Sequence, residues 1–431
     1  MGWSRGQRLR VPRLLLCLML AGRAAQVIPF FIYHVPDAET VATVVVPADY
    51  PADYGASDLA RARAFNRGLL FGGMARSVTW VLTVLTLLAS GIAARIGLYH
   101  PHTRRAWLIR VLFLVAVFIC LRVVEIPFIL CRLRHFQAFG LTPLTFGGWT
   151  ELLLLGLPLP LTLFVLKYLL VICSFPLFRQ FWWIGSCLCI FLLFEVVPEA
   201  ASRRYPVDPV TTLSPLPQGP HSDAITAVLR TTGTSLPLMV VDQGSRENTA
   251  NIYIAGRHGR EYVVITDTFL RQFPPEDAAL ALAHELAHLG NATALRLTDK
   301  ALSLLALTLG FFLAFLLTGR TAVPISAALN TVLVLMLCMT LASFLLQPFS
   351  RAYTRSQELA ADREAVRLVP ERDAYQRLLV KMAKLNLDPL EMPGWEEYFF
   401  SSYPSAMTRL RSIERGSPDA SHTERAPQPG E

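Results

Sequence analysis

Long apolar segments separated by short polar ones dominate the chain. About seven of them approach the roughly 20 helical residues that cross a bilayer core about 30 Å thick. They are Val11–Tyr33, Leu69–Leu98, Ala106–Cys131, Leu152–Cys173, Phe181–Val197, Ala301–Thr318 and Val323–Leu346. The pattern therefore predicts a mostly α-helical, polytopic membrane protein built around a bundle of about seven transmembrane helices.

The first apolar segment is the least regular, because Arg23 interrupts it. Its basic start and the short run Leu14–Leu20 also suit a secretory signal peptide, with Gly22-Arg23-Ala24 as a weak cleavage site. Residues 1–33 are therefore predicted to be either a first transmembrane helix or a signal peptide.

Composition agrees with a membrane protein and argues against a nucleic-acid partner. Of 431 residues, 53% are hydrophobic and 17% are charged, whereas soluble domains have about 45–50% apolar and about 25% charged residues. The formal net charge is +8, but the basic residues are scattered singly at loop ends, without a basic run or interleaved aromatic residues. In a membrane protein such charges mainly set orientation. We therefore expect a lipid bilayer as partner and no nucleic acid.

Polar stretches divide the membrane segments into parts. The larger polar regions are long enough to fold outside the bilayer, and the proline-containing end is predicted to be disordered. The predicted division is residues 34–68, a polar loop; 69–197, transmembrane helices two to five; 198–300, a first folded part; 301–347, transmembrane helices six and seven; 348–414, a second folded part; and 415–431, the tail.

The first folded part is predicted to contain a short helix and a small sheet. Ser222–Thr231 has a helical pattern, and Leu238–Val241 is typical of a strand. The apolar and β-branched stretches Asn251–Ala255 and Tyr262–Thr266 flank the turn Gly256-Arg257-His258-Gly259. This pattern predicts a β-hairpin.

A further helix in this part carries the sequence His284-Glu285-Leu286-Ala287-His288. Pro274-Pro275-Glu276-Asp277 is a typical helix start, and Gly290 is a natural stop. Residues i and i+4 lie one turn apart on one helix face, so both imidazoles can reach one zinc ion. A chance HExxH match is the alternative, but this neutral, alanine-rich face has no other use for two histidines.

Glu285 lies about 100° around the helix from His284, close to the open position of the metal but not obliged to be a ligand. Zinc lowers the pKa of a bound water towards about 7. Glu285 can then act as the general base that takes the proton of this water during its attack on a peptide carbonyl. The motif therefore predicts peptide-bond hydrolysis by a Glu-activated, zinc-bound water.

Catalytic zinc also needs a third protein ligand. Glu358 is the best candidate, and Asp362, one turn further on the same helix face, could accept the free N–H of a ligating histidine. Both acids could instead form surface ion pairs with Arg355 or Arg363. The residue pattern alone leaves these two interpretations open.

An ordered set of motifs accompanies the HExxH sequence. Thr354–Asp362 fits (S/T)-R-x-x-E-x-x-A-D, and Pro215-Leu216-Pro217 fits a P-L-P linker. Asp242–Arg246, followed by Asn251-Ile252-Tyr253, resembles the elements D-x-S-x-R and N-A-Y/F. With these motifs and the order of its membrane segments, the chain resembles the integral-membrane zinc proteases typified by the type I CAAX prenyl endoprotease, and more distantly the heat-shock membrane protease HtpX.

The resemblance implies a gluzincin-type zinc protease domain that binds one Zn²⁺ per chain. His284, His288 and Glu358 would be the zinc ligands. Glu285 would be the general base, and Asp362 would orient a ligating histidine.

The resemblance also implies roles outside the ligand set. Asn251 and Tyr253 would lie on an edge strand that pairs with the substrate backbone, although the pattern also fits a plain hairpin. The family pattern S-x-H-P is replaced by Ser402-Tyr403-Pro404, with Arg409-Leu410 in register beside the site. Tyr403 thus replaces a histidine thought to assist catalysis; it either keeps that role or merely packs beside the proline.

These observations predict a membrane-embedded zinc endopeptidase. Its substrates would be peptides or proteins that are lipidated, as in CAAX processing, or membrane-associated. Broader proteolysis of membrane or misfolded proteins is the alternative, because recognition by a backbone edge is indifferent to side chains. A catalytically inactive membrane scaffold is the alternative from another class, and the complete set of ligands and general base argues against it.

Two signals disagree about orientation in the membrane. The resemblance implies that the zinc domain lies on the cytoplasmic side, with the N-terminus opposite. The arginines within the first 13 residues and the pair Arg104-Arg105 favour a cytoplasmic N-terminus, which with an odd number of crossings puts the zinc domain outside. We follow the resemblance and expect a multi-pass protein whose zinc domain is cytoplasmic.

Overall fold

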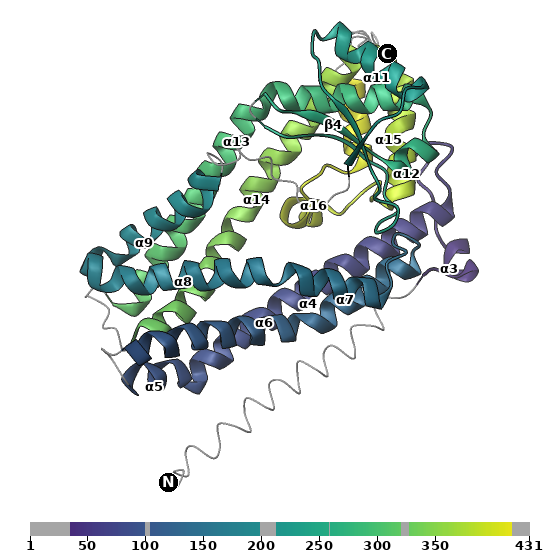
Figure 1. Cartoon of the computed structure of the whole chain (residues 1–431). Helices are drawn as coiled ribbons and strands as arrows, with labels where there is room; N and C mark the ends of the chain where they lie inside the picture. Colours follow the sequence, from purple (N-terminus) through teal and green to yellow (C-terminus); the bar gives the residue numbers. More distant parts are fainter. Residues whose placement is uncertain (1–34, 100–103, 199–212, 258, 320–326, 416–431) are drawn as a thin grey trace, which may run out of the picture.

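The computed structural model describes residues 35–99, 104–198, 213–257, 259–319 and 327–415. The first apolar segment and the tail, predicted for residues 1–33 and 415–431, therefore lie outside the described residues, except for Arg415. In Figure 1 long helices form a frame, and a small sheet with short helices closes one end of it.

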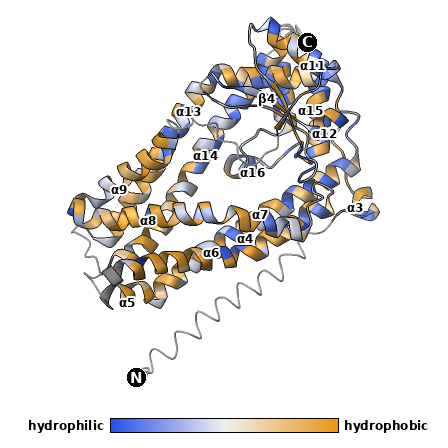
Figure 2. Cartoon of the chain, in the orientation of Figure 1, coloured by the Kyte–Doolittle hydropathy of each residue, from blue (hydrophilic) through white to orange (hydrophobic). Residues whose placement is uncertain are grey.

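Within the described residues, five helical stretches are long and apolar enough to cross a membrane: Ala56–Ser90, Trp107–Ala138, Phe146–Val196, Pro275–Thr318 and Ala328–Leu368. Figure 2 shows that hydrophobic residues dominate these stretches away from the sheet. The predicted helical membrane architecture is confirmed. The count of seven is not, because the fourth and fifth apolar segments belong to one helical stretch and the first lies outside the described residues.

The frame consists of α4 (Ala56–Ser90), α5 (Ile92–Tyr99), α6 (Arg104–Ala138), α7 (Phe146–Gly156), α8 (Pro158–Phe178), η1 (Arg179–Phe181), α9 (Trp182–Phe191), η2 (Leu192–Val196), α13 (Pro275–Thr318) and α14 (Ala328–Leu368). Gly91 ends α4 with a φ of 66°. Glycine adopts this left-handed conformation without strain, and the predicted segment Leu69–Leu98 is therefore divided between α4 and α5.

Helices α13 and α14 each run without a break from the membrane bundle into the polar domain. The expectation that Gly290 ends the HExxH helix is wrong, because α13 continues to Thr318. A glycine inside a helix costs only about 1 kcal/mol relative to alanine, and the packing of α13 against α14 along their length outweighs it. At Gly310 a Cβ atom would lie 2.6 Å from the sulfur of Met339, so glycine allows this close approach.

The sheet has the order β1-β2-β4-β3. Its strands are β1 (Leu213–Pro215), β2 (Leu238–Val241), β3 (Ile252–Ala255) and β4 (Tyr262–Thr266). Strands β3 and β4 are antiparallel and form the predicted hairpin, whereas β2 and β4 are parallel. Strand β1 ends at Pro215, the first residue of the predicted P-L-P linker, and it pairs antiparallel with β2. Within the described sheet β3 is therefore an edge strand.

Short helices complete the polar domain: α3 (Ala38–Ala42), α11 (Pro220–Thr231), α12 (Asp267–Gln272), α15 (Arg372–Asn386), α16 (Gly394–Phe400) and α17 (Ala406–Arg415). The apolar sides of α11, α12, α15 and α17 share one core with the sheet and the first part of α13, in which Ile225, Phe269 and Leu282 are fully buried. This core fixes the HExxH turns of α13 relative to α14 and α15.

A cavity of about 1200 Å³ extends from the polar domain into the frame. Its wall includes residues of α4, α13, α14, α15, α16 and β3. Side chains from distant parts of the chain therefore face one common space.

Candidate metal centre

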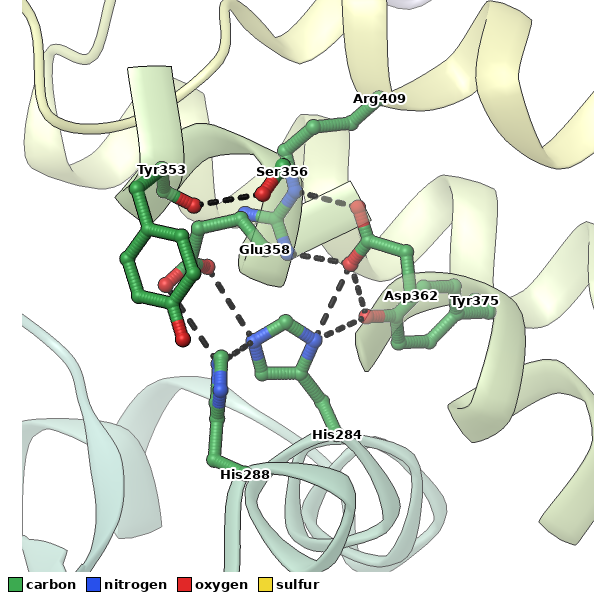
Figure 3. Close-up of polar contacts among 8 residues, drawn as sticks. All are labelled: His284, His288, Tyr353, Ser356, Glu358, Asp362, Tyr375 and Arg409. Atoms are coloured by element: carbon green, nitrogen blue, oxygen red, sulfur yellow. Dashed lines mark hydrogen bonds and ion pairs between the residues drawn. The ribbon is translucent and has the colours of Figure 1, made fainter. Parts of the chain in front are cut away.

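Two helices bring the three predicted metal ligands together (Figure 3). His284 and His288 lie one turn apart on α13, and Glu358 faces them from α14. The Nε2 atoms of the two histidines are 3.1 Å apart. Each Nε2 atom is 3.4 Å from an oxygen of the Glu358 carboxylate. One ligand atom from each residue thus points towards a common centre.

The chemistry of this group fits a catalytic zinc ion. Two imidazole nitrogens and one carboxylate oxygen lie within 4.8 Å of one another, and His₂Glu is a ligand set of catalytic zinc sites. His284 and Glu358 are only 9% and 7% exposed. A carboxylate that is nearly removed from water needs a positive partner, and a metal ion held by these three residues would supply it.

A buried network fixes the orientation of His284. Its Nδ1 atom is 3.0 Å from Oδ1 of Asp362 and 3.0 Å from the hydroxyl of Tyr375. The Tyr375 hydroxyl donates to Asp362 at 2.7 Å, so its single proton is already used. We therefore assign the proton of neutral His284 to Nδ1, which leaves the lone pair of Nε2 directed towards the centre.

Arg409 on α17 holds the other side of the Asp362 carboxylate. Its Nε and Nη2 atoms donate to the two carboxylate oxygens at 2.8 and 2.6 Å. Burial acts to lower the pKa of Arg409, but the charge of Asp362 outweighs it and keeps the pKa well above its ordinary value. Asp362 is fully buried and therefore does not form the surface ion pair with Arg363 that the sequence left open.

Arg355 does not form the surface ion pair that the sequence left open. Instead of pairing with Glu358, it donates through Nη1 to the carbonyl oxygens of Glu397 and Ser401, each at 2.7 Å. These contacts join α14 to the end of α16 and to the loop that carries Tyr403. The loop is thereby held at the wall of the cavity.

Glu285 faces the same cavity as the three ligands without joining them. It is partly buried, and its carboxylate lies against the backbone N–H of Ile254 on β3. A carboxylate in this position is free to accept a proton from a molecule bound in the cavity.

Tyr403 also lines the cavity, and 61% of its surface is accessible. Burial of the hydroxyl raises its pKa above the ordinary value, and the carboxylates of Glu358 and Glu285 raise it further. The hydroxyl is therefore a protonated donor at neutral pH. Ser401 fixes the turn, since its hydroxyl donates to the Tyr403 carbonyl at 2.6 Å.

Asn251 and Tyr253 lie where β3 borders the cavity. Asn251 is exposed, and its backbone carbonyl accepts from the N–H of Thr266 on β4 at 3.0 Å. The side of β3 away from β4 has no neighbouring strand in the described sheet. An extended peptide in the cavity could therefore extend the sheet by pairing with β3.

Residues 217–416 match the model of peptidase family M48. This part of the chain is therefore similar to peptidase family M48. The match covers the sheet, the HExxH helix, α14 and the helices that follow. The resemblance predicted from the motifs is confirmed.

Curated relatives agree with this assignment. The chain is 26% identical over 184 residues to YhfN of Bacillus subtilis (strain 168), an uncharacterized metalloprotease, covering 41% of this chain and 42% of YhfN. It is 29% identical over 217 residues to the CAAX prenyl protease 1 homolog of Arabidopsis thaliana, covering 47% of this chain and 49% of the relative. The matches thus span about half of the length of these relatives.

The fold extends the likeness beyond the residues that match family M48. The structure of S. mikatae Ste24p superposes with a TM-score of 0.66 and 15% sequence identity, covering 96% of this chain and 100% of that one. At this identity the comparison shows a common fold, including the frame of long helices.

Two residues at this candidate site were not found from the sequence. Tyr375 lies on α15, and no spacing rule relates that helix to α13 or α14. Asp388, in the loop after α15, lines the cavity. Burial raises the pKa of Asp388 to about 6, although Arg409 acts to lower it. Neither residue belongs to a recognised motif, and only the packing of α15 places them at the site.

Proposed function

We propose that the protein is a zinc-dependent endopeptidase that hydrolyses peptide bonds of membrane-associated substrates. The observation that carries the proposal is the convergence of His284, His288 and Glu358 beside Glu285, in a cavity walled by membrane-capable helices. The match to family M48 and the metalloprotease relatives support it. Broader proteolysis remains the alternative function of the same site.

In the proposed mechanism, different residues of this chain hold the metal, bind the substrate and transfer the proton. His284, His288 and Glu358 would hold one zinc ion, which when bound polarises a carbonyl and lowers the pKa of water. Strand β3 holds the substrate in an extended conformation by backbone hydrogen bonds. Glu285 accepts the proton of the attacking water and then gives it to the leaving amine.

The cavity wall favours a lipidated substrate. Large apolar side chains of α4 and α14 face the cavity on the membrane side of the metal centre, among them Met74, Val78 and Phe344, which are exposed. An apolar chain attached to the substrate would cover this surface and be removed from water, at about 0.8 kcal/mol for each buried CH₂ group. We therefore propose prenylated peptides as the preferred substrates, in agreement with the names of the plant relatives.

Cleavage of matched peptides tests this preference. The purified full-length enzyme should cleave a prenylated peptide with a much higher kcat/KM than the same peptide with a free cysteine, because burial of the prenyl chain contributes binding energy. Mass spectrometry of the products measures both rates. Equal rates on the two peptides would contradict the lipid preference and favour the broader protease.

Tyr403→Phe tests whether the Tyr403 hydroxyl assists catalysis. Attack on the peptide carbonyl places negative charge on its oxygen, and a donor opposite the metal stabilises that charge. Because its pKa is raised, the hydroxyl stays protonated through neutral pH, and no alkaline loss of activity from this donor is expected there. The substitution should lower kcat by about 10²–10³.

A matched variant separates this role from packing. Tyr398→Phe removes a hydroxyl from an exposed residue of α16 that does not line the cavity, and its kcat should equal that of the wild type. If Tyr403→Phe also retains kcat within a factor of about three, far below the loss expected for an oxyanion donor, the residue only packs at the site.

We also propose that the zinc domain faces the cytoplasm, a proposal supported by the family resemblance and opposed by the N-terminal arginines. A reporter that is active only outside the cytoplasm, fused after the last residue, should be inactive. Reporter activity would reverse the proposed orientation.

A further inference from the structure

The backbone groups of β3 alternate between the sheet and the open side of the strand. In an antiparallel pair, each residue either exchanges both backbone hydrogen bonds with the opposite strand or points both groups away from it. Asn251 is of the first kind, because its carbonyl accepts from the N–H of Thr266 at 3.0 Å and its N–H donates to the Thr266 hydroxyl at 2.9 Å. The backbone groups of Ala250, Ile252 and Ile254 therefore point away from β4, to the open side.

Asn386 occupies this open side at Ala250. Its Oδ1 atom accepts from the Ala250 N–H at 3.0 Å, and its Nδ2 group donates to the Ala250 carbonyl at 3.2 Å. The carboxamide thus makes the two hydrogen bonds that a residue of a neighbouring strand would make. Asn386 lines the cavity, and Ala250 behind it is only 1% exposed. A peptide that enters the cavity therefore meets a backbone that is already paired at Ala250.

The end of α15 gives Asn386 a fixed support. Helix α15 ends at Asn386, and Leu387 follows with a φ of 57°, a left-handed conformation that leucine keeps only where its surroundings stabilise it. Asn66 of α4 provides such a contact, because its Nδ2 group donates to the Leu387 carbonyl at 2.7 Å. Asp388 and Pro389 continue the cavity wall from this turn. The open side of β3 is thus closed at this end by the C-terminus of α15 and the loop after it.

Glu285 marks the other end of the same open side. Its carboxylate accepts from the backbone N–H of Ile254, which is four residues after Ala250. At about 3.3 Å per residue, this is about 13 Å along the strand. Ile252 lies midway and lines the cavity, while its side chain is in the core of the polar domain. In the described part of the chain, Ile252 is therefore the position between Glu285 and Asn386 at which both backbone groups remain for a substrate.

We propose that Asn386 is a positioning residue that ends the pairing of the substrate with β3. A peptide extended along the strand forms hydrogen bonds with Ile252 but not with Ala250, and it leaves the sheet where it meets Asn386. This inference rests on the proposed peptidase function and refines it. The substrate is then extended only beside the cleaved bond. Its residue opposite Ala250 needs no backbone N–H, so proline is accepted at that position.

A scan of backbone esters tests the proposal on the full-length enzyme. In each peptide one amide N–H, away from the cleaved bond, is replaced by an ester oxygen, which removes a single hydrogen-bond donor. Loss of a donor that pairs with β3 should lower kcat/KM by about 2- to 10-fold, the range of one hydrogen bond. Because alternate residues face the strand, the sensitive positions of the wild type should be every second residue and should end at the one opposite Ile252.

Two variants assign the end of pairing to the Asn386 side chain. Asn386→Ala uncovers the backbone of Ala250, so one further position should become sensitive to the ester, two residues beyond the last sensitive position of the wild type. Asn386→Asp has nearly the same size and still accepts from the Ala250 N–H, but it cannot donate to the Ala250 carbonyl. That carbonyl is then available to a peptide N–H, and the same further position should become sensitive.

Asn248→Ala is the matched control. Asn248 supports the loop before β3 from outside the cavity wall, where its Nδ2 group donates to the Gly140 carbonyl at 3.0 Å. Its replacement weakens the support of the same segment without uncovering Ala250, so the sensitive positions should be those of the wild type. If Asn386 only stabilises the fold, its variants should likewise keep the wild-type positions, with lower activity on every peptide.

Binding of the same peptides to Glu285→Gln protein, measured by fluorescence anisotropy, separates pairing from turnover. The proposal is overturned if both Asn386 variants keep the wild-type positions, or if no ester weakens cleavage or binding in the wild type. The peptidase function stands in either case, provided that the parent peptide is cleaved. A parent peptide that is not cleaved although zinc is bound overturns the peptidase function, and the binding pattern still tests Asn386.

Discussion

Replacing Glu285 by glutamine should nearly abolish turnover while leaving zinc bound. Glu285 faces the cavity beside the three ligands but is not one of them. Glutamine keeps the size of the side chain and its contact with β3 but cannot accept a proton from water. General-base catalysis contributes about 10²–10⁴-fold, and the fall in kcat should be at least of this order. Peptide cleavage and the zinc content of the same preparation are measured together.

Glu276→Gln is the matched control for this prediction. Glu276 is an exposed residue in the first turn of α13 and lies outside the cavity. Its replacement changes the charge of the same helix by the same amount and should leave kcat unaltered. Retained turnover in Glu285→Gln would show that another residue accepts the proton.

Glu358→Ala should lose zinc as well as activity. Glu358 is buried between the two histidines and supplies the third ligand atom. Removing it leaves two imidazoles, whereas catalytic zinc sites use three protein ligands. Zinc remaining after dialysis and the rate of peptide cleavage should fall together, whereas Glu285→Gln should lose only the activity.

Glu364→Ala provides the comparison for Glu358→Ala. Glu364 follows on the same helix, but its side chain is 44% exposed and paired with Arg367 at 3.1 Å. It should keep both zinc and activity. Loss of zinc from Glu364→Ala, with full occupancy in Glu358→Ala, would transfer the third ligand to Glu364.

Local spacing was sufficient to place two of the three candidate ligands side by side. His284 and His288 are brought together by a single turn of helix, which the sequence shows directly. Strands β2 and β4 followed from short β-branched segments bounded by turns. Glu358 and Asp362 needed the longer family motif, because their own spacing fitted a surface ion-pair pattern equally well.

The remaining features depend on packing between distant segments. Tyr375 reaches His284 only because α15 packs against α13. Gly290 suggested a helix end, but tertiary contacts with α14 carried α13 past it. The cavity likewise depends on the packing of α4 against α14. The periodicity of a single segment does not predict such contacts between distant segments.

The central claim is that His284, His288 and Glu358 hold one catalytic zinc ion per chain. The most direct test measures zinc content in two dialysed, full-length proteins, the wild type and Glu358→Ala. Mass spectrometry gives the zinc content, and peptide cleavage is measured on the same preparations. The wild type should contain one zinc per chain and be active, and the variant should contain almost none and be inactive. Full zinc occupancy and activity in Glu358→Ala would contradict the account.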